Sequence, residues 1–311
     1  MKVSFKTLLA FAAILIIWGL NFIFVGTAVK YSPPVWLSFL RAFSGFGGAL
    51  ILLLAFRTKG NLTFRQKLVA FLLGMPGTGI FFAFWMIGEL TVPPGEVSVM
   101  IYTFPIWTLF LSIPILGDWP SPLKIGASFL GFAGVALVAR IGTETFAGSA
   151  IAIALLVTAG FSFALDTVLF KRLFKGEQLV RANVWQLGGA SVFLLIWALL
   201  SEPIQKIEWT YQLVGSIAWI GVLGTALVYV LWFTLLSRYN AASFAAYAFL
   251  VVMVALAASF LIFGERIDAL QMVGVVALMI SIYLVNKSDE ERKPERKKVQ
   301  EKSASDSEKR F

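Results

Sequence analysis

A glycine pattern that occurs twice constrains the fold of this chain more than any other feature. Residues 74–79 (GMPGTG) and residues 221–225 (GVLGT) each begin with two glycines three positions apart. In both copies a glycine followed by an acid lies 40 positions after the second of these glycines, at Gly117-Asp118 and at Gly264-Glu265. An internal repeat of about 147 residues in an apolar chain indicates a duplicated membrane unit.

Composition restricts the protein to the membrane class. Of the 311 residues, 59% are hydrophobic and 14% are charged, and the mean hydropathy is +0.85. Soluble domains carry roughly 25% charged residues. Cysteine and histidine are absent, which excludes disulfides, thiol nucleophiles and Cys/His metal sites. The sequence predicts no cofactor and no metal, and it contains no nucleotide-binding motif.

The apolar segments predict an all-α polytopic membrane protein with ten transmembrane helices. A span needs about 20 apolar residues. The predicted spans are 7–29, 34–56, 66–88, 94–116, 122–140, 149–170, 183–201, 211–236, 241–263 and 267–286.

Lysine and arginine residues predict the orientation of these spans, because basic residues are enriched in cytoplasmic segments. With the N-terminus inside, the inner segments hold 21 basic residues and the outer links hold 4. Both termini are therefore expected in the cytosol of a protein of the plasma membrane. The segment 287–311 is expected to be a charged, disordered cytosolic tail. The net charge of +9 reflects these helix ends and the tail, so it indicates lipid contact and no nucleic-acid partner.

Two five-span units must lie in opposite orientations, because five is an odd number. The first predicted repeat covers 7–142 and the second covers 149–286, which gives a five-plus-five inverted-topology repeat. Inverted repeats are a recurring architecture of secondary transporters, in which two similar halves alternate access to a central site.

Arg41 is the charged residue that the sequence places deepest in a span. It lies seven residues beyond Pro34, about 10 Å along the helix. We interpret Arg41 as a ligand for an anionic substrate group or as a gate charge. The structural alternative is an ion pair or snorkelling to the interface. Asn21 is expected at similar depth, where it orients Arg41, contacts substrate or bonds two packed spans.

Asp166 and Gln186 occupy the corresponding positions of the second repeat. Asp166 lies five residues before Lys171 and six before Arg172, so it is expected either to pair with these cations or to take part with Gln186 in proton or cation coupling. Glu89 and Glu96 flank a Pro-Pro-Gly link and are expected to be solvated on the outer side; the alternative is that they form an outer vestibule.

Matched glycines and threonines indicate where the two halves form a binding site. Glycine permits close helix contact, and interruptions at corresponding places point to the site. Close packing alone is the alternative. The helix-packing glycines are Gly74, Gly77, Gly79, Gly221 and Gly224, and the hydroxyls beside them belong to Thr78 and Thr225.

Aromatic residues are expected to line an apolar cavity. The candidates are Trp85, Tyr102, Tyr229 and Tyr247. Pro105 should kink the fourth span, whereas the ninth span has no proline at the matching place. The sequence therefore predicts that the two halves differ at this point.

These features together resemble the EamA-type family of the drug/metabolite transporter superfamily. The resemblance covers residues 8–286 and rests on Trp18-Gly19-x-Asn21-Phe22, on Leu40-Arg41, on Phe104-Pro105 and on the glycine pairs described above. Asp118 stands where the family motif usually has Glu, and Val252 stands where the ninth span usually has proline.

The resemblance implies a secondary transporter, an exporter of small metabolites such as amino acids that works by alternating access around a central cavity. The alternative is a carrier of a drug-like amphiphile or of a sugar or nucleotide conjugate. A membrane-embedded receptor or scaffold would not need matched interruptions, and an enzyme would need convergent acids or bases that the spans lack. The expected partners are a small-molecule substrate and the lipid bilayer. The sequence does not define the oligomeric state.

Overall fold

The computed structural model describes residues 5–56, 61–92, 94–138, 149–263, 268–285 and 287–288. Within these ranges the chain is helical and contains no strand. The helices are α1 (Phe5–Ala28), α2 (Pro34–Phe56), α3 (Phe64–Gly74), η1 (Met75–Gly79), α4 (Ile80–Gly88), α5 (Pro94–Ile101), α6 (Phe104–Leu116), α7 (Pro122–Val138), α8 (Ala150–Leu173), α9 (Gln178–Ser201), η2 (Ile204–Lys206), α10 (Tyr211–Ile217), η3 (Ala218–Leu227), α11 (Val228–Leu236), α12 (Ala241–Ala246), α13 (Phe249–Phe263) and Ala269–Val285.

Seven helical stretches of the described chain are long and apolar enough to cross a membrane. Three shorter apolar helices, Pro122–Leu137, Ala241–Ala255 and Ala269–Val285, accompany them. These shorter helices coincide with the predicted fifth, ninth and tenth spans. The expectations for 139–142, for Gly264-Glu265 and for the tail beyond Ser288 lie outside the described residues.

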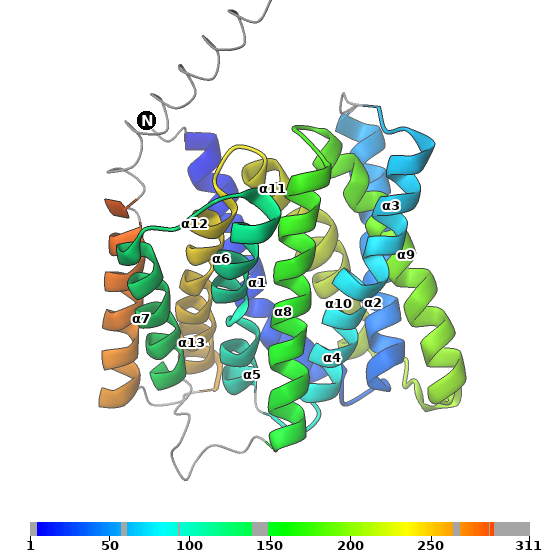
Figure 1. Cartoon of the computed structure of the whole chain (residues 1–311). Helices are drawn as coiled ribbons and strands as arrows, with labels where there is room; N and C mark the ends of the chain where they lie inside the picture. Colours follow the sequence, from blue (N-terminus) through cyan, green and yellow to red (C-terminus); the bar gives the residue numbers. More distant parts are fainter. Residues whose placement is uncertain are drawn as a thin grey trace, which may run out of the picture.

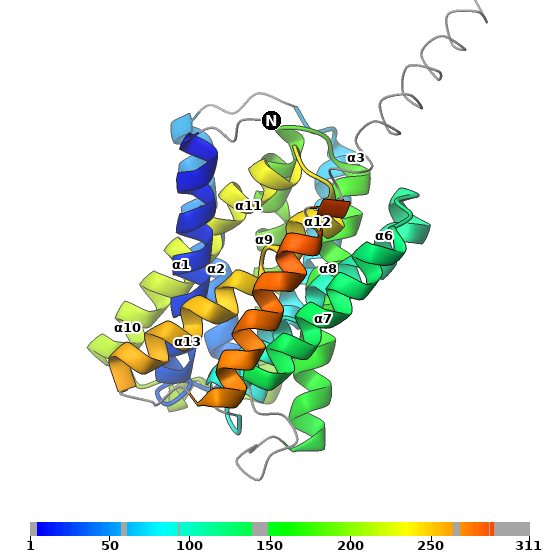
Figure 2. The ribbon, with the colours of Figure 1, turned by 90° about the vertical axis from the view of Figure 1, so that its left-hand side faces the viewer.

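The helices lie side by side in one bundle, with their connections at its two ends (Figure 1, and turned by 90° in Figure 2). Helices of the first half pack mainly on helices of the second half. Thus α2 contacts α9 and η3, and α8 contacts α4 and α6, while α1 contacts α13. The centre of the bundle is therefore an interface between the two halves.

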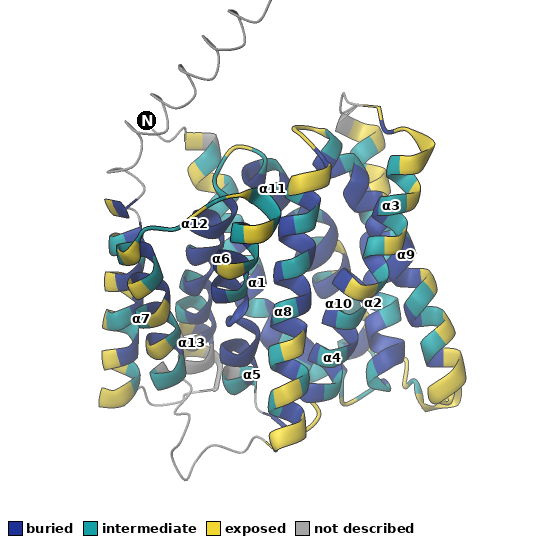
Figure 3. Cartoon of the chain, viewed as in Figure 1, coloured by how far each residue is buried: buried dark blue, intermediate teal, exposed yellow. Residues whose placement is uncertain are grey.

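Buried residues gather on the inner faces of the helices and exposed ones on the periphery and the ends (Figure 3). Large apolar side chains are exposed at the periphery, including Leu54 (69%), Ile151 (75%) and Leu200 (83%). Such an apolar outer surface suits contact with lipid chains and would be costly in water.

The two glycine-rich stretches form π-helical segments. η1 contains Pro76, which has no backbone N–H, whereas η3 contains no proline. In η3 the Thr225 hydroxyl donates to the Ile220 carbonyl, five residues earlier, at 2.8 Å. Because π segments widen the helix and shift its hydrogen bonds, the third and eighth predicted spans both deviate from regular geometry at their midpoints.

The predicted difference between the fourth and ninth spans is wrong. The chain breaks at residues 102–103 between α5 and α6, and Pro105 lies in the first turn of α6. It breaks in the same way at residues 247–248 between α12 and α13, where no proline is present. In both breaks the backbone forms bonds to the third residue back, from Thr103 to Met100 (3.3 Å) and from Ala248 to Ala245 (2.9 Å). Because these tighter bonds replace the helical ones, the break does not require proline.

The crossing of α3 and α9 generates a stability prediction. A Cβ atom added at Gly189 would lie 1.8 Å from the Phe71 carbonyl oxygen, whereas one added at Gly47 would meet no atom within 4 Å. Gly189→Ala should lower the Tm, because overpacking reduces the free energy of unfolding by about 1–3 kcal/mol. The matched Gly47→Ala should hold or raise the Tm through better helix propensity. Thermal unfolding in detergent, followed by tryptophan fluorescence, measures both, and equal Tm values would contradict the close crossing.

Candidate functional site

A small cavity lies at the centre of the bundle, between the two halves. Its volume is about 20 Å³, which is room for roughly one water molecule. All but two of the side chains that line it are aromatic: Trp18, Phe22, Arg41, Phe81, Trp85, Ile101, Tyr102, Phe104, Phe163 and Tyr229. The described conformation therefore holds a nearly closed aromatic chamber with one cation in its wall.

Arg41 is held in this wall by a threonine of the other half and by two rings. Its side chain is 1% exposed. Its Nε donates to the Thr225 hydroxyl at 3.1 Å. The guanidinium carbon lies 4.1 Å from the centre of the Phe82 ring and 4.5 Å from that of Trp85, distances at which an aromatic face attracts a cation. Nη1 donates to no described residue, so one donor of Arg41 remains available at the cavity.

Glu89 is a residue of this region that the sequence analysis missed. It caps the C-terminal end of α4 and is 5% exposed, so the expectation of a solvated Glu89 is wrong. It lies against α1 near the start of α5, since a Cβ atom added at Gly26 would lie 3.2 Å from Glu89 Oε1 and 2.9 Å from Pro94. Trp85 Nε1 donates to the Glu89 carboxylate at 2.5 Å. The four-residue spacing from Trp85 to Glu89 on one helix face was the available signal.

A second polar cluster surrounds Gln186 on α9. The Gln186 amide Nε2 donates to the Thr78 hydroxyl at 2.9 Å and to the Asp166 carboxylate. Asp166 is 2% exposed. Lys171, the expected partner of Asp166, instead donates to backbone carbonyls of the α11–α12 connection. The structure therefore brings Asp166 and Gln186 together, away from that cation.

The two clusters have the same arrangement, with the first and second halves in exchanged roles. Arg41 of the first half bonds Thr225 of the second, and Gln186 of the second half bonds Thr78 of the first. Arg41 and Gln186 are 145 positions apart, and Thr78 and Thr225 are 147 apart. Equivalent side chains thus make equivalent contacts across the interface.

Two packing glycines show the same correspondence between the halves. A Cβ atom at Gly224 would lie 2.3 Å from Asn21 Oδ1, and one at Gly77 would lie 2.5 Å from Asp166 Oδ1. Asn21 is fully buried, and its amide has no hydrogen-bond partner among the described residues.

Further glycines sit at the same interface. A Cβ atom at Gly74 would lie 2.0 Å from the Gln186 carbonyl, one at Gly221 would lie 1.8 Å from the Ser44 hydroxyl, and one at Gly79 would lie 2.7 Å from Phe193.

The backbone of each π segment accepts a side-chain bond from the opposite half. Trp18 Nε1 donates to the Gly224 carbonyl at 3.1 Å. The Ser162 hydroxyl donates to the Gly77 carbonyl at 3.0 Å, which also accepts the Ile80 N–H of its own span. Each half thus contributes a hydrogen bond to the irregular backbone of the other.

The tyrosine candidates separate into two groups. Tyr102 and Tyr229 line the cavity, and the Tyr229 hydroxyl has no partner among the described residues. Tyr247 does not line it, because its ring packs edge-on against Phe11 of α1 with centres 5.4 Å apart. Pro105 is buried and also lies outside the lining. The sequence analysis did not select Phe81 and Phe163, which complete the aromatic wall.

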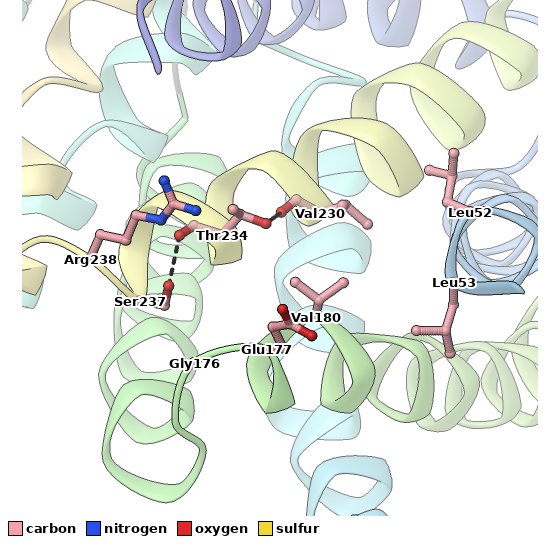
Figure 4. Close-up of a pocket in the computed structure, with 9 residues that line it drawn as sticks. All are labelled: Leu52, Leu53, Gly176, Glu177, Val180, Val230, Thr234, Ser237 and Arg238. Atoms are coloured by element: carbon pink, nitrogen blue, oxygen red, sulfur yellow. Dashed lines mark hydrogen bonds between the residues drawn. The ribbon is translucent and has the colours of Figure 1, made fainter. Parts of the chain in front are cut away.

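A larger crevice of about 420 Å³ opens at the end of the bundle that carries the α8–α9 and α11–α12 connections. Leu52 and Leu53 lie on one side of it, and Glu177, Thr234 and Arg238 face the space from the other side (Figure 4). Its volume lies in the range of small-molecule pockets.

A helix cap lies at the opposite end of the bundle. The Glu202 carboxylate accepts the backbone N–H groups of Val35 and Trp36 at 3.0 Å each, and Trp36 Nε1 donates to the Glu202 carbonyl. A carboxylate on the first N–H groups of α2 is a favourable helix cap. This cap ties the start of α2 to the C-terminal end of α9.

No group of three or more His, Cys, Asp or Glu side chains within the described part of the chain could hold a metal ion.

The profile of the EamA-like transporter family matches the chain twice, over residues 5–140 and over residues 150–287. The chain belongs to the EamA-like transporter family. The two matches coincide with the two halves that exchange contacts in the structure, and together they leave only a short link and the tail unmatched.

Curated relatives with transporter names match this chain over most of their own length. The uncharacterized transporter YvbV of Bacillus subtilis is 29% identical over 302 residues, which cover 96% of this chain and 97% of YvbV. A probable amino-acid metabolite efflux pump of Salmonella typhimurium is 24% identical over 284 residues, covering 87% and 91%. A crystal structure shares the fold with a TM-score of 0.74 at 14% identity, covering 92% of this chain and 99% of that one.

The pair of Trp85 and Glu89 generates a second prediction. Trp85→Phe keeps a ring beneath Arg41 but removes the donor to Glu89, and Glu89→Gln removes the acceptor charge. Each change should lower the Tm and the free energy of unfolding. The double variant should lose less free energy than the two single variants together, by about 0.5–3 kcal/mol. The measurement is a double-mutant cycle on thermal unfolding. Trp209→Phe, at a position 65% exposed, is the control, and strictly additive losses would show that the bond contributes nothing.

Proposed function

We propose that this protein is a secondary transporter that moves small metabolites, such as amino acids, out of the cell by alternating access around the central aromatic cavity. Arg41 in the wall of that cavity is the observation that carries the proposal. Its guanidinium is buried between the halves and keeps one donor without a described partner. An intramembrane charge at a repeat interface is a functional site by default.

The proposed architecture is ten spans in two inverted five-helix repeats, 7–142 and 149–286. The exchanged contacts of Arg41 with Thr225 and of Gln186 with Thr78 support it. So do the π segments in corresponding spans and the breaks at residues 102–103 and 247–248, which are 145 positions apart. A two-fold axis in the membrane plane accounts for all three pairs.

The proposed substrate class combines a carboxylate with an apolar or aromatic side chain. The carboxylate would accept from Arg41 Nη1, a charge-assisted bond that the present conformation leaves unmade. The aromatic lining would pack on the side chain. Outward transport of amino acids is favoured by the efflux-pump names of two relatives, from Salmonella typhimurium and Escherichia coli.

The described conformation fits a step of such a cycle in which the centre is occluded. A cavity of about 20 Å³ is too small for an amino acid, so binding requires the halves to separate. The open crevice lies at the end that the basic residues assign to the cytosol, and the Glu202 cap on α2 lies at the other face. We place the protein in the plasma membrane, with both termini cytosolic.

Transport by Arg41 variants tests the proposal. Proteoliposomes loaded with unlabelled amino acids should accumulate labelled aromatic or aliphatic amino acids by counterflow. Arg41→Ala should abolish this counterflow, because the carboxylate loses its cation. Arg41→Lys should retain part of it, because a lysine keeps the charge but not the planar donor set.

Counterflow at the normal rate by a folded Arg41→Ala protein would remove Arg41 from the binding site. Absence of counterflow by the unaltered protein for every amino acid would redirect the test to drug-like amphiphiles, for which the aromatic wall is equally suited.

The absence of cysteine allows a direct test of orientation. Glu177→Cys and Glu208→Cys place single thiols at exposed positions of connections at opposite ends of the bundle. In intact cells, an impermeant maleimide should label the thiol at position 208 and not the thiol at position 177. Labelling of position 177 from outside would reverse the proposed orientation.

A further inference from the structure

Asp166 is a buried carboxyl group that lies outside the central cavity. It does not line the aromatic chamber. Its Oδ2 accepts from the Gln186 amide, and its Oδ1 has no partner among the described residues. An ionisable side chain inside a membrane is expensive unless it is paired or performs a function.

The described residues give Asp166 no ion-pair partner. Among the elements packed on α8, η1, α4, α6 and α12 contain no charged residue. α5 carries Glu96, and α3 carries Arg65 and Lys67, which lie more than two helical turns before Gly77. On its own helix, the Nζ of Lys171 is directed to the Leu236 and Tyr239 carbonyls. On α9, Arg181 lies more than one turn before Gln186. Tyr229 of α11, which lines the cavity together with Arg41, is a titratable group near Asp166.

A proton can neutralise a carboxyl in such surroundings. An ionised group without a cation loses most of its solvation in an apolar interior, whereas the protonated form carries no net charge. The described neighbours suit a proton better than a metal cation as the bound species. Gln186 directs an N–H donor at Oδ2, Oδ1 has no partner among the described residues, and these residues provide no cluster of further acids.

The position of Asp166 connects it with the π segment η1. Its side chain rests on Gly77 in the π segment η1, where a Cβ atom would clash with it. Ser162, one turn earlier on α8, bonds the carbonyl of the same glycine. A rearrangement of η1 against α8 would therefore change the access of water to the carboxyl group.

We propose that Asp166 is a proton-binding site that couples transport to the proton gradient. This inference rests on the transport function proposed above. In one conformation the carboxylate takes a proton from water at one membrane face, and in the other it releases the same proton to water at the opposite face. One proton crosses per cycle, and no other bond forms or breaks. Tyr229, which is near Asp166 and lines the cavity with Arg41, would link this step to the cavity.

The first test is independent of the substrate. Dicyclohexylcarbodiimide is apolar and reacts with protonated carboxyls, whose oxygen bonds to the carbodiimide carbon while the proton passes to nitrogen. Membranes containing the full chain are treated over a range of pH, and mass spectrometry resolves modification at Asp166 from modification at Glu89. Labelling of Asp166 that falls several-fold as the pH rises is expected. Labelling that is absent, or that does not change with pH, would overturn the proposal.

The second test separates coupling from translocation. Asp166→Asn should retain counterflow of labelled phenylalanine and lose the accumulation that a pH gradient drives. Glu208→Gln, an exposed acid on a connection, should keep both. Gradient-driven accumulation by Asp166→Asn at the level of the unaltered protein would overturn the inference. If the unaltered protein shows no phenylalanine counterflow, the substrate proposal fails, and the carbodiimide result alone decides whether Asp166 binds a proton.

Discussion

The structure depends on the requirement that every irregular piece of backbone in a membrane finds a hydrogen-bond partner within the protein. Two π segments at the centre of the bundle depart from regular helical bonding. A carbonyl of each accepts a side-chain bond from the opposite half, from Trp18 at Gly224 and from Ser162 at Gly77. Contacts from the other half therefore complete the bonding of both central spans. In the proposed transport cycle the same interface opens, so stability and function act on the same contacts.

Glycine at the interface makes this arrangement possible. Gly77 and Gly224 allow Asp166 and Asn21 to approach the π segments to distances that any side chain would block. Without Cβ atoms, the polar groups of one half can reach the backbone of the other. A pair of halves in close backbone contact has few intermediate arrangements, because packed interiors shift between discrete states and do not deform continuously.

The sequence predicted the apolar segments well, because the membrane allows few backbone solutions and the glycine repeat fixes the register of the halves. Arg41 could be singled out because an isolated charge in an apolar span is easily seen. Glu89 could not be placed, because its burial depends on α1 and α5 folding over the end of α4. Tyr247 was misplaced for a similar reason, since its ring turns toward Phe11 of α1. Positions that depend on contacts between distant spans leave no periodic signal in a single sequence.

The two halves share a scaffold but not its charges. At equivalent places the first half has Arg41 and Asn21, and the second has Gln186 and Asp166. Exchange of a cation with an amide, and of an amide with an acid, leaves the packing intact, since all four side chains are buried against the same kind of threonine or glycine. A strictly symmetric pair would place like charges on both sides of the centre. The divergence instead puts a cation in the wall of the cavity and an acid behind the opposite π segment, so that each half can carry a different part of one transport cycle.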